Sequence, residues 1–534
     1  MIYKGTAVSQ GLALGKAYIL KNSQPEIPEI SINESRIDEE IVSYRRMKDT
    51  AMRELDSIIK RRGGDDILSA QLMLLKDEFL DEEVISFIKK DLCDARTAVY
   101  KGYTKTAALF SASSDELLKE RAYDIKDIMG RLLGAGVKEE KETDIPDGPF
   151  ILVCEDLLPS DDIWDHASSV KAIVSRGGGT VSHSAIMARS YKIPMVSGVY
   201  GILDEAAPGD EIIVDAITGE VILRPDEPVK EAYLQRLEAY KADEKDNETY
   251  KDKEAVTRDG QKIDVLINIG ADWKNELAYF PYCEGVGLFR TEFIFMRQDR
   301  MPSETEQFEV YKSILEAAGD KPVIIRTLDT GADKKLPYLG VPAEANPSLG
   351  RRGIRFCLKE KDLFKTQLRA LLRASACGNL YIMIPMVTVP ADMEDARELL
   401  NEAAAELTAQ GIKVSDKIRL GMMIETPAAA VMADAFAEIA DFASIGTNDL
   451  VQYIMAADRD NPAVSEYLRG DDRAVMRMIA SVGEVFEKAG KWLGVCGEMA
   501  STEEGIKKLL KAGIRKISVS PGRLGRVKRY IINM

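Results

Sequence analysis

The sequence predicts an α/β protein of several domains, in which a small α/β domain carries an inserted helical bundle and is followed by a (β/α)8 barrel of the TIM type. Three observations lead to this prediction. At 534 residues the chain is too long for one hydrophobic core. Helical periodicity replaces strand patterns between about residues 33 and 136, and strands return afterwards. From about residue 260 onwards, eight apolar strand-like runs alternate with helices.

Composition and charge favour an enzyme in a reduced compartment. The chain is 45% hydrophobic and 30% charged, and its 72 Lys+Arg against 88 Asp+Glu give a net charge of −16. This balance argues against nucleic acid or an anionic membrane as the main partner. We find no signal region at the N-terminus and no apolar run long enough to span a bilayer. The 6 cysteines are scattered without a CxxC pair, so we expect a cytoplasmic protein without disulfides or a zinc site.

Two groups of short strands build the first α/β domain. Residues 1–22 contain strand-like runs that Gly11 and Gly15 are expected to interrupt. After the helical segment, apolar runs return at 150–154, 170–174, 195–196 and 211–215. We therefore expect one α/β domain made of residues 1–22 and 145–224, split by a helical domain of residues 23–144.

Helical patterns mark the insertion and a later linker. Asn33-Glu34-Ser35 can cap a long amphipathic stretch from Ile37 to Ile59. Further helical stretches follow at 67–75, 81–92, 95–109 and 115–133. Residues 225–258 are helical in pattern and highly charged, which indicates a solvated linker helix between domains.

Residues 259–534 have the alternation of a barrel. The expected strands are 265–269, 285–289, 323–325, 381–384, 420–424, 442–445, 492–495 and 516–520. Eight repeats over this length fit a (β/α)8 barrel, whose active site lies at the carboxyl ends of its strands.

His183 is the most informative single residue, because it is one of only 2 histidines in 534 residues. It follows Gly177-Gly178-Gly179 and precedes an apolar helical run. A helix N-terminus offers free N–H groups and a positive dipole end, which suit a phosphate group. Imidazole can act there as a nucleophile as well as a base. We prefer this interpretation to that of a polar surface turn, whereas we expect His166 to be a surface helix residue.

Polar side chains follow the expected barrel strands where each strand ends. The runs are Arg290-Thr291-Glu292, Arg326-Thr327-Leu328-Asp329, Glu425-Thr426-Pro427, Gly446-Thr447-Asn448-Asp449 with Asp458-Arg459 beyond it, and Cys496-Gly497-Glu498. Arginine presents a rigid fork that fits phosphate and carboxylate, and Mg²⁺ binds one or two carboxylates together with substrate oxygens. Singly, each residue is equally well explained by a buried ion pair or a core cysteine. Together they predict a small phosphate-bearing anion and a divalent metal.

These motifs resemble those of Enzyme I of the bacterial sugar phosphotransferase system, a family of phosphoenolpyruvate–protein phosphotransferases. The resemblance covers essentially the whole chain in the family's domain order. It rests on the His183 run and on residues 285–293, 326–329, 344–350, 424–427, 444–450 and 494–498.

The resemblance implies a reaction and its residues. Phosphoenolpyruvate (PEP) would bind in the barrel mouth, its phosphoryl group would pass to Nε2 of His183 on a swivelling domain, and pyruvate would be released. The implied roles are substrate binding by Arg290, Arg326, Lys334, Arg352, Asn448 and Arg459, Mg²⁺ binding by Glu425 and Asp449, and protonation of the enolate carbon by Cys496. The helical domain would dock the phosphocarrier HPr, whose histidine receives the phosphoryl group, and the barrel would form a homodimer.

Three departures from the family pattern lie on the phosphohistidine and carrier side. The family usually reads Gly-Gly-Arg-Thr-Ser-His where this chain has Thr180-Val181 before Ser182 and His183. Gln71 takes the place of a family histidine, and Lys126 that of an arginine. The acceptor is therefore left open between HPr and a related carrier that serves regulation.

Two alternatives belong to other classes. A pyruvate phosphate dikinase-like enzyme shares the histidine domain and the barrel, but it needs a large ATP-binding domain, and this chain has no Gly-rich segment of that kind. A regulatory paralogue that binds a carrier without turnover needs neither metal ligands nor a proton donor. The presence of Arg290, Glu425, Asp449 and Cys496 argues against it.

Overall fold

The structure is a computed structural model that describes most of the chain. It describes residues 1–20, 29–61, 66–111, 116–134, 145–146, 148–157, 161–177, 182–271, 273–296, 300–331, 336–339, 344–459 and 461–534. These residues form two compact units, Met1–Lys241 and Ala242–Met534. Within the described ranges, none of the helices has the length and apolar character that crossing a membrane requires.

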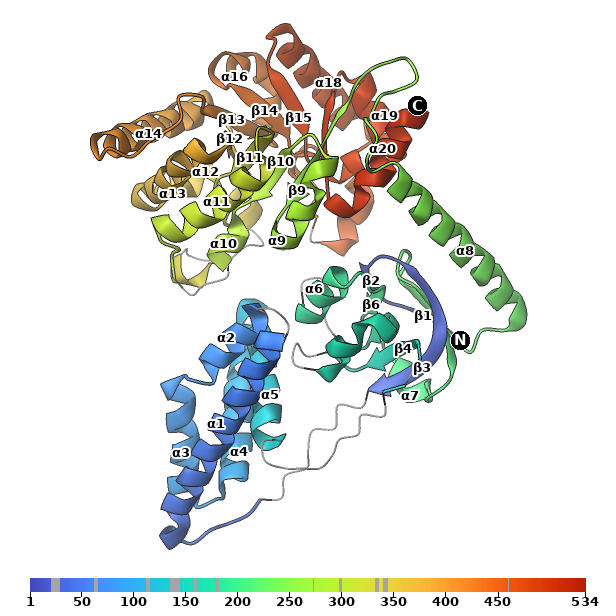
Figure 1. Cartoon of the computed structure of the whole chain (residues 1–534), viewed down its shortest axis with the longest axis vertical. Coiled ribbons are helices and arrows are strands. Elements are labelled where there is room, and N and C mark those ends of the chain that lie inside the picture. The colour runs from blue at the N-terminus through green and yellow to red at the C-terminus, as the bar shows by residue number, and fades with distance from the viewer. Residues whose placement is uncertain are drawn as a thin grey trace. The chain divides into compact units, whose positions relative to one another are not determined.

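The first unit contains a mixed sheet of eight strands in the described part of the chain (Figure 1). The strands are β1 (Ile2–Lys4), β2 (Thr6–Ser9), β3 (Leu12–Leu20), β4 (Phe150–Cys154), β5 (Val170–Ser175), β6 (Met195–Ser197), β7 (Glu211–Asp215) and β8 (Glu220–Leu223), in the order β1-β8-β7-β3-β4-β5-β6-β2. Strand β3 pairs in parallel with β4 and antiparallel with β7. The two groups of strands that flank the helical segment therefore share one sheet, as the sequence predicts.

The expected interruption at Gly15 is wrong. Strand β3 runs through Gly15, which pairs with Ile212 of β7. A Cβ atom at this position would lie 3.3 Å from the side chain of Ile151 and 3.4 Å from that of Lys171. The glycine thus lets neighbouring side chains approach the strand closely, which is one of its uses inside a sheet.

Helices fill the segment between β3 and β4. They are η1 (Glu34–Arg36), α1 (Ile37–Arg61), α2 (Asp66–Leu74), α3 (Glu78–Lys90), α4 (Ala95–Ser111) and α5 (Glu116–Gly134). The buried residues of α1 include Tyr44, Met47, Ala51 and Leu55, whose spacing of three or four places them on one helical face. They join buried residues of the other helices in one hydrophobic core, as an amphipathic bundle requires.

The other helices of the first unit lie among the later strands. They are η2 (Asp162–Ser169), α6 (His183–Ser190), α7 (Ile202–Glu205) and the beginning of α8 (Glu227–Thr249). Helix α8 is continuous, and it is less solvated than the sequence suggests. Its Tyr233 is buried and donates to the carbonyl of Val214 at 2.9 Å, and Arg236 pairs with Asp215 at 2.6 Å. One face of the charged helix is thus covered by the sheet.

The end of α8 belongs to the second unit, where it packs on the C-terminal helix α20 (Leu524–Asn533). Arg529 pairs with Asp243 and with Asp246, the latter at 2.8 Å, and Arg526 pairs with Glu244. Acidic residues that look solvated in the sequence therefore have specific cationic partners.

The second unit is a closed barrel of eight parallel strands within the described residues (Figure 1). Its strands are β9 (Asp264–Ile269), β10 (Val286–Arg290), β11 (Pro322–Arg326), β12 (Asn379–Ile384), β13 (Arg419–Ile424), β14 (Phe442–Ile445), β15 (Trp492–Val495) and β16 (Lys516–Val519). Pairing of β16 with β9 closes the barrel. The predicted TIM-type architecture is confirmed.

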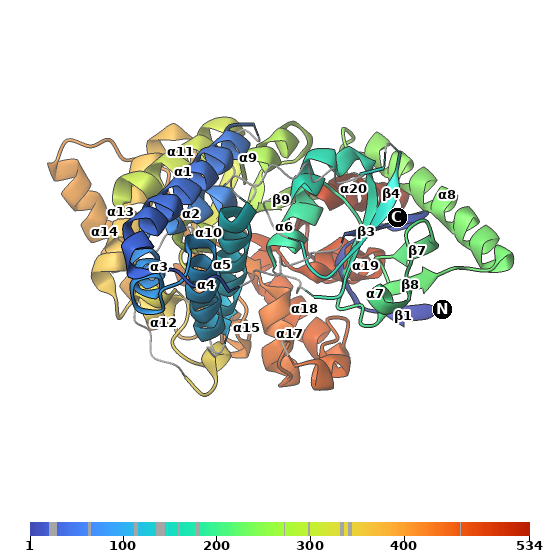
Figure 2. The same ribbon diagram turned by 90° about the horizontal axis from the view of Figure 1, so that it is seen from below.

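Helices surround the barrel, and α11 and α13 pack against each other on its outside (Figure 2). The α-helices are α9 (Trp273–Glu276), α10 (Glu292–Met296), α11 (Glu304–Ala318), α12 (Ile354–Cys357), α13 (Lys361–Ala374), α14 (Pro390–Ala409), α15 (Pro427–Val431), α16 (Ala433–Ile439), α17 (Thr447–Met455), α18 (Arg473–Lys488), α19 (Glu503–Lys511) and α20. The 3₁₀ turns are η3 (Leu277–Tyr282), η4 (Pro337–Leu339), η5 (Pro347–Leu349), η6 (Ser375–Cys377), η7 (Pro462–Tyr467), η8 (Glu498–Ser501) and η9 (Pro521–Arg523).

The barrel interior is a packed core. Leu288, Ile324, Met383 and Phe442 belong to a buried cluster that is separate from the layer between the strands and the helices. Because side chains fill the inside of the barrel, a binding site has to lie beyond this core, at one end of the strands.

Candidate active site at the carboxyl end of the barrel

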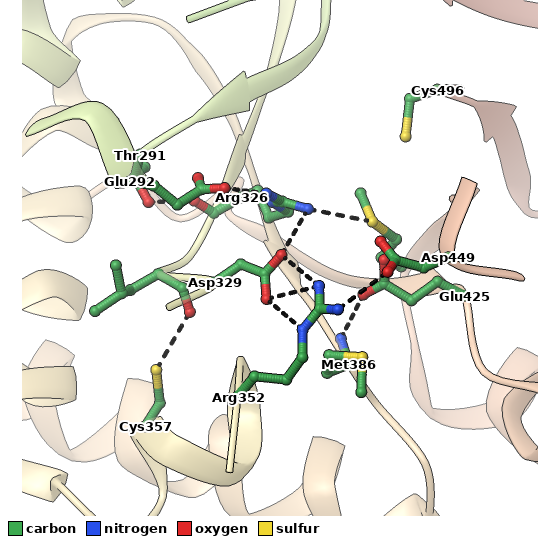
Figure 3. Close-up of polar contacts among 12 residues, drawn as sticks. Thr291, Glu292, Arg326, Asp329, Arg352, Cys357, Met386, Glu425, Asp449 and Cys496 are labelled. Atoms are coloured by element: carbon green, nitrogen blue, oxygen red, sulfur yellow. Dashed lines mark hydrogen bonds and ion pairs between the residues drawn. The ribbon is translucent and has the colours of Figure 1, made fainter. Parts of the chain in front are cut away.

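Charged side chains meet where the barrel strands end (Figure 3). Arg326 is the last residue of β11, Glu425 directly follows β13, and Cys496 directly follows β15. Asp449 lies in the first turn of α17, and Arg352 lies just before α12. Strands and short connections from different parts of the barrel therefore supply the candidate site.

Arg326 is held by two carboxylates. Its side chain is buried, its Nη2 atom pairs with Glu292, and its Nη1 atom lies 3.1 Å from Oδ2 of Asp329. Burial by itself would lower the pKa of Arg326, but the carboxylates of Glu292 and Asp329 outweigh this effect and raise the pKa. The guanidinium group is therefore fixed both in charge and in orientation.

Arg352 occupies the centre of the network, and it is only 2% exposed. Its Nη2 atom donates to Oδ1 and Oδ2 of Asp329 at 3.2 and 3.0 Å, and its Nε atom donates to Oδ1 at 3.3 Å. Its Nη1 atom donates to Oδ1 of Asp449 at 3.0 Å and to the hydroxyl of Tyr453 at 3.3 Å. Burial opposes the charged form, but Asp329 and Asp449 raise the pKa of Arg352, so it remains a cation.

Glu425 and Asp449 form the candidate metal site. Glu425 is fully buried, and its Oε1 atom accepts from the backbone N–H of Met386 at 2.6 Å. Its Oε2 atom is buried without a hydrogen-bond partner among the described residues. Burial, and then the negative charges of Asp449 and Asp329, raise the pKa of Glu425. A buried oxygen without a partner, next to a second carboxylate, fits a hard divalent cation.

The donor set matches a metal that also binds substrate. The described part of the chain contains no group of three or more His, Cys, Asp or Glu residues that could hold a metal ion. Mg²⁺ is usually bound by one or two carboxylates, and substrate oxygens and water complete its shell. Two carboxylates are therefore a sufficient protein contribution.

Cys496 is a buried thiol at the end of β15. The hydroxyl of Ser444 donates to its Sγ atom at 3.3 Å. Burial raises the pKa of the Cys496 thiol, although the hydrogen bond from Ser444 acts in the opposite direction. The thiol thus keeps its proton at neutral pH and is able to act as a proton donor.

The remaining predicted residues lie nearer to solvent. Arg290, at the end of β10, and Asn448, in α17, are exposed. Oδ1 of Asn448 accepts from the backbone N–H of Glu498 at 3.1 Å, and Nη1 of Arg459 lies 3.6 Å from Oδ2 of Asp449. Lys334 lies outside the described residues.

Sequence reasoning assigned no role to several residues that organise this site. Glu292 and Asp329 belong to the runs at the strand ends, so the sequence indicates their position. It does not indicate that they pair with Arg326 and Arg352. Tyr453 lies four residues after Asp449 on α17, a helical spacing that places the two on one side. The N–H of Met386 leaves no trace in the sequence, because its role depends on a backbone with a positive φ of 58°.

The other half of the predicted reaction involves α6. His183 is the first residue of α6, and the Ser182 side chain caps this helix by accepting from the N–H of Ala185 at 3.3 Å. The Thr180-Val181 departure lies outside the described residues. His166 is exposed in η2, as expected.

The unusual Gln71 is buried in the helical bundle. Its Nε2 atom donates to Oδ1 of Asp124 at 3.1 Å and to Oδ2 of Asp127 at 2.9 Å, so that it bridges α2 and α5. Lys126, between the two aspartates, is exposed. Of these two departures, only Lys126 presents its side chain to the surface.

Comparisons with known proteins agree with this geometry. Three family models match, namely the N-terminal part of PEP-utilising enzymes over residues 4–121, their mobile domain over 146–219, and their PEP-binding domain over 244–534. Phosphoenolpyruvate-protein phosphotransferase of Staphylococcus carnosus is 40% identical over 536 residues, covering 99% of this chain and 93% of the relative. The protein of the same description from Staphylococcus aureus is 39% identical over 542 residues, with 99% and 94% covered. That from Bacillus subtilis is 41% identical over 528 residues, with 97% and 92% covered.

Proposed function

The chain belongs to the phosphoenolpyruvate–protein phosphotransferase (Enzyme I) family of PEP-utilising enzymes, and we propose that its barrel passes the phosphoryl group of PEP to His183. One observation carries this proposal. Two buried guanidinium groups, Arg326 and Arg352, lie at the barrel mouth beside Glu425, whose Oε2 atom has no partner among the described residues. This arrangement suits an anionic substrate and a divalent cation.

Arginines bind the substrate anion. Arg326 and Arg352 neutralise and orient the phosphoryl group, and the exposed Arg290 and Asn448 contact substrate that enters from solvent. Arg459 contributes a further positive charge beside Asp449, and we assign Lys334 to the same group on the family resemblance. Phosphoryl transfer depends mainly on position and charge neutralisation, and guanidinium forks supply both.

Glu425 and Asp449 hold Mg²⁺ in this proposal. When bound there, the ion supplies positive charge to the oxygens of the substrate. The two carboxylates supply the protein ligands, and Arg352 and Arg459 lie close to Asp449. The unpartnered oxygen of Glu425 supports this assignment, because a buried carboxylate oxygen is otherwise costly to leave unpaired.

His183 and Cys496 carry the bond changes. Nε2 of His183 attacks phosphorus, the bond from phosphorus to the enol oxygen breaks, and its electron pair leaves with the enolate. The Cys496 thiol gives its proton to the enolate carbon, which yields pyruvate and a thiolate that takes up a proton from solvent. The N–H groups at the beginning of α6 are able to donate hydrogen bonds to a phosphoryl group on His183.

The domain boundaries and the carrier complete the proposal. Residues 1–22 and 145–224 form the phosphohistidine domain, 23–144 the carrier-binding domain, 225–258 the linker helix, and 259–534 the PEP-binding and dimerisation domain. The acceptor is the histidine of HPr or of a related regulatory carrier. The protein acts in the cytoplasm in the first step of sugar uptake, where its free cysteines remain reduced.

Labelling with PEP tests the first half-reaction. Incubation of the whole chain with PEP labelled in its phosphoryl group and Mg²⁺ is expected to give an acid-labile label on the protein. The label should be lost in His183→Ala and kept in His166→Ala, which removes the other histidine. Label that persists in His183→Ala contradicts the proposal.

Transfer from the labelled protein tests the acceptor and the assembly. Purified HPr and each related carrier are added in turn, and the carrier that removes the label fastest is the acceptor. Sedimentation equilibrium measures the dimer. A monomer at micromolar concentration contradicts the dimer proposal and leaves the chemistry intact.

A further inference from the structure

We propose that Asp329 is a positioning residue whose carboxylate sets the orientation of both Arg326 and Arg352 for the substrate. The proposal rests on the proposed substrate role of these two arginines. Asp329 is 1% exposed and lies in the connection that follows β11 (Figure 3). An ordinary surface ion pair is exposed to solvent, whereas Asp329 is buried and pairs with two arginines.

The carboxylate of Asp329 is shared between two guanidinium groups. Arg352 approaches with its Nε and Nη2 atoms, which donate at 3.0 to 3.3 Å. Arg326 approaches Oδ2 with its Nη1 atom at 3.1 Å. A fork that meets both oxygens of a carboxylate has a defined plane and direction, whereas a single contact leaves the guanidinium group free to rotate. Asp329 thus sets the plane of Arg352, and together with Glu292, which pairs with Nη2, it holds Arg326 at two points.

The backbone around Asp329 is itself anchored. The side chain of Gln367, in α13, accepts from the N–H of Leu328 at 2.9 Å and donates to the hydroxyl of Thr291 at 3.2 Å. The Thr291 hydroxyl donates to the carbonyl of Arg326 at 2.8 Å. The ends of β10 and β11 are therefore tied to an outer helix, so that Asp329 has a rigid support.

Asp329 also shares Arg352 with the proposed metal ligand Asp449. If Asp329 lost its negative charge, Arg352 would keep one carboxylate among its described partners, that of Asp449. Arg326 would keep that of Glu292. Arg352 would then pair more strongly with Asp449 and compete with a cation for it.

The test replaces Asp329 by an uncharged residue of the same shape. Asp329→Asn is expected to raise the KM for PEP at least about tenfold, because a hydrogen bond between charged groups typically contributes at least that factor. The change in kcat should be smaller than the change in KM. In the absence of PEP, the same variant should bind Mn²⁺ several-fold more weakly, as measured by electron paramagnetic resonance of the free ion.

A matched control separates this role from a general structural one. Asp215 is another buried aspartate, 3% exposed, and pairs with Arg236 in the first unit. Asp215→Asn should leave both the KM for PEP and the affinity for Mn²⁺ unchanged. A purely structural defect in Asp329→Asn would lower the active fraction, and hence kcat, at an unchanged KM, and this result would overturn the proposal.

Two further variants keep the outcome decisive. If Asp329→Asn does not fold, Asp329→Glu retains the charge but displaces both arginines, and it should raise KM at a similar kcat. An unchanged KM in that variant overturns the proposal. Arg326→Lys tests the proposed function itself. If Arg326→Lys loses affinity for PEP while Asp329→Asn binds PEP normally, only the role of Asp329 is contradicted. If Arg326→Lys also binds PEP normally, the proposed function itself fails at this site.

Discussion

At the residue scale, the barrel mouth depends on side chains whose protonation is set by burial and by neighbouring charges. Arg326 and Arg352 are kept charged by carboxylates, whereas Cys496 is kept neutral by burial. Each protonation state suits the task proposed for the residue, since guanidinium groups are able to bind an anion and a neutral thiol is able to give up a proton.

Replacement of Cys496 tests its proposed role as the proton donor. Cys496→Ala is expected to lower the rate of pyruvate formation by about 10²- to 10⁴-fold, the usual contribution of a general acid. Its affinity for PEP should change little, because the arginines remain. Steady-state kinetics and PEP binding measured by calorimetry check this expectation. Cys377→Ala, at a half-buried cysteine in η6, is the control, and equal losses in both variants would argue against a specific role for Cys496.

The pH dependence of Cys496 follows from its raised pKa. Because burial raises the pKa above 9.0, the proton-donor form persists through neutral pH and is lost only as pH rises through the raised value. Ser444→Ala removes a hydrogen bond that favours the thiolate, so it should move this loss to still higher pH. Ultraviolet absorbance of the thiolate against pH measures the shift. A shift to lower pH in Ser444→Ala would contradict this account of the Cys496 environment.

How much of the site the sequence reveals depends on chain distance. Residues that directly follow strands, such as Glu425 and Cys496, were predicted to lie together because parallel strands end at one edge. The sharing of Asp329 between Arg326 and Arg352 was not predicted, because Arg352 lies 23 positions after Asp329 and meets it only through the tertiary structure. The role of Met386 was invisible for a similar reason, since a backbone N–H has no sequence signature.

At the scale of elements, the helix α11 begins with a capping box that responds to pH. Ser303 accepts from the N–H of Glu306, and the Glu306 carboxylate accepts from the N–H of Ser303 and pairs with Arg300. These hydrogen bonds, that from Arg300 foremost, lower the pKa of Glu306 from 4.5 to about 2. The N-terminus of α11 is thus held by an ionised carboxylate.

The expected stability effect has a definite sign. A lowered pKa means that Glu306 stabilises the folded state fully above pH 4.5, and that this contribution is lost as pH falls through about 2. The free energies of unfolding of the wild type and of Glu306→Gln should therefore differ most near neutral pH and converge in acid. Urea denaturation at several pH values measures the difference, and Glu309→Gln, in the same helix, is the control. A difference that grows in acid would contradict the assignment.

Strands of different kinds were predictable to different degrees. The barrel strands are buried on both sides and read as continuous apolar runs, so all eight were located from the sequence. Strand β8 was missed, because it is only four residues long, begins with Glu220 and alternates between half-buried and buried residues. The partners of α8 were missed for a third reason, since its acidic residues meet arginines almost 300 positions away in the sequence.

At the scale of the whole molecule, the proposed chemistry is divided between two units of the fold. The residues proposed to bind PEP and metal belong to Ala242–Met534, and His183 belongs to Met1–Lys241. As proposed, the first half-reaction needs both units. Transfer between His183 and a carrier would use proposed residues of the first unit alone.

Metal removal is expected to separate the two half-reactions. In the whole chain with a chelator, labelling of His183 from PEP should be lost, whereas labelling from the phosphorylated carrier should continue. Glu425→Gln should reproduce this pattern without a chelator, because it removes a proposed ligand of the metal. Label incorporation from each donor is the measurement, and equal inhibition of both routes would contradict the division of labour between the units.

The shared carboxylate of Asp329 has a consequence for the order in which ligands arrive. The buried charges of the barrel mouth comprise two cations, Arg326 and Arg352, and four ionisable carboxyl groups, Glu292, Asp329, Glu425 and Asp449. With all of them ionised, two positive and four negative charges leave an excess of two negative charges, which one divalent cation cancels. Burial, and then the same excess of negative charge, raise the pKa of Glu425. Electroneutrality therefore favours entry of the cation before the anion, so that PEP meets a mouth that no longer repels it. On this basis we expect the proposed metal to act as an electrostatic gate for the substrate.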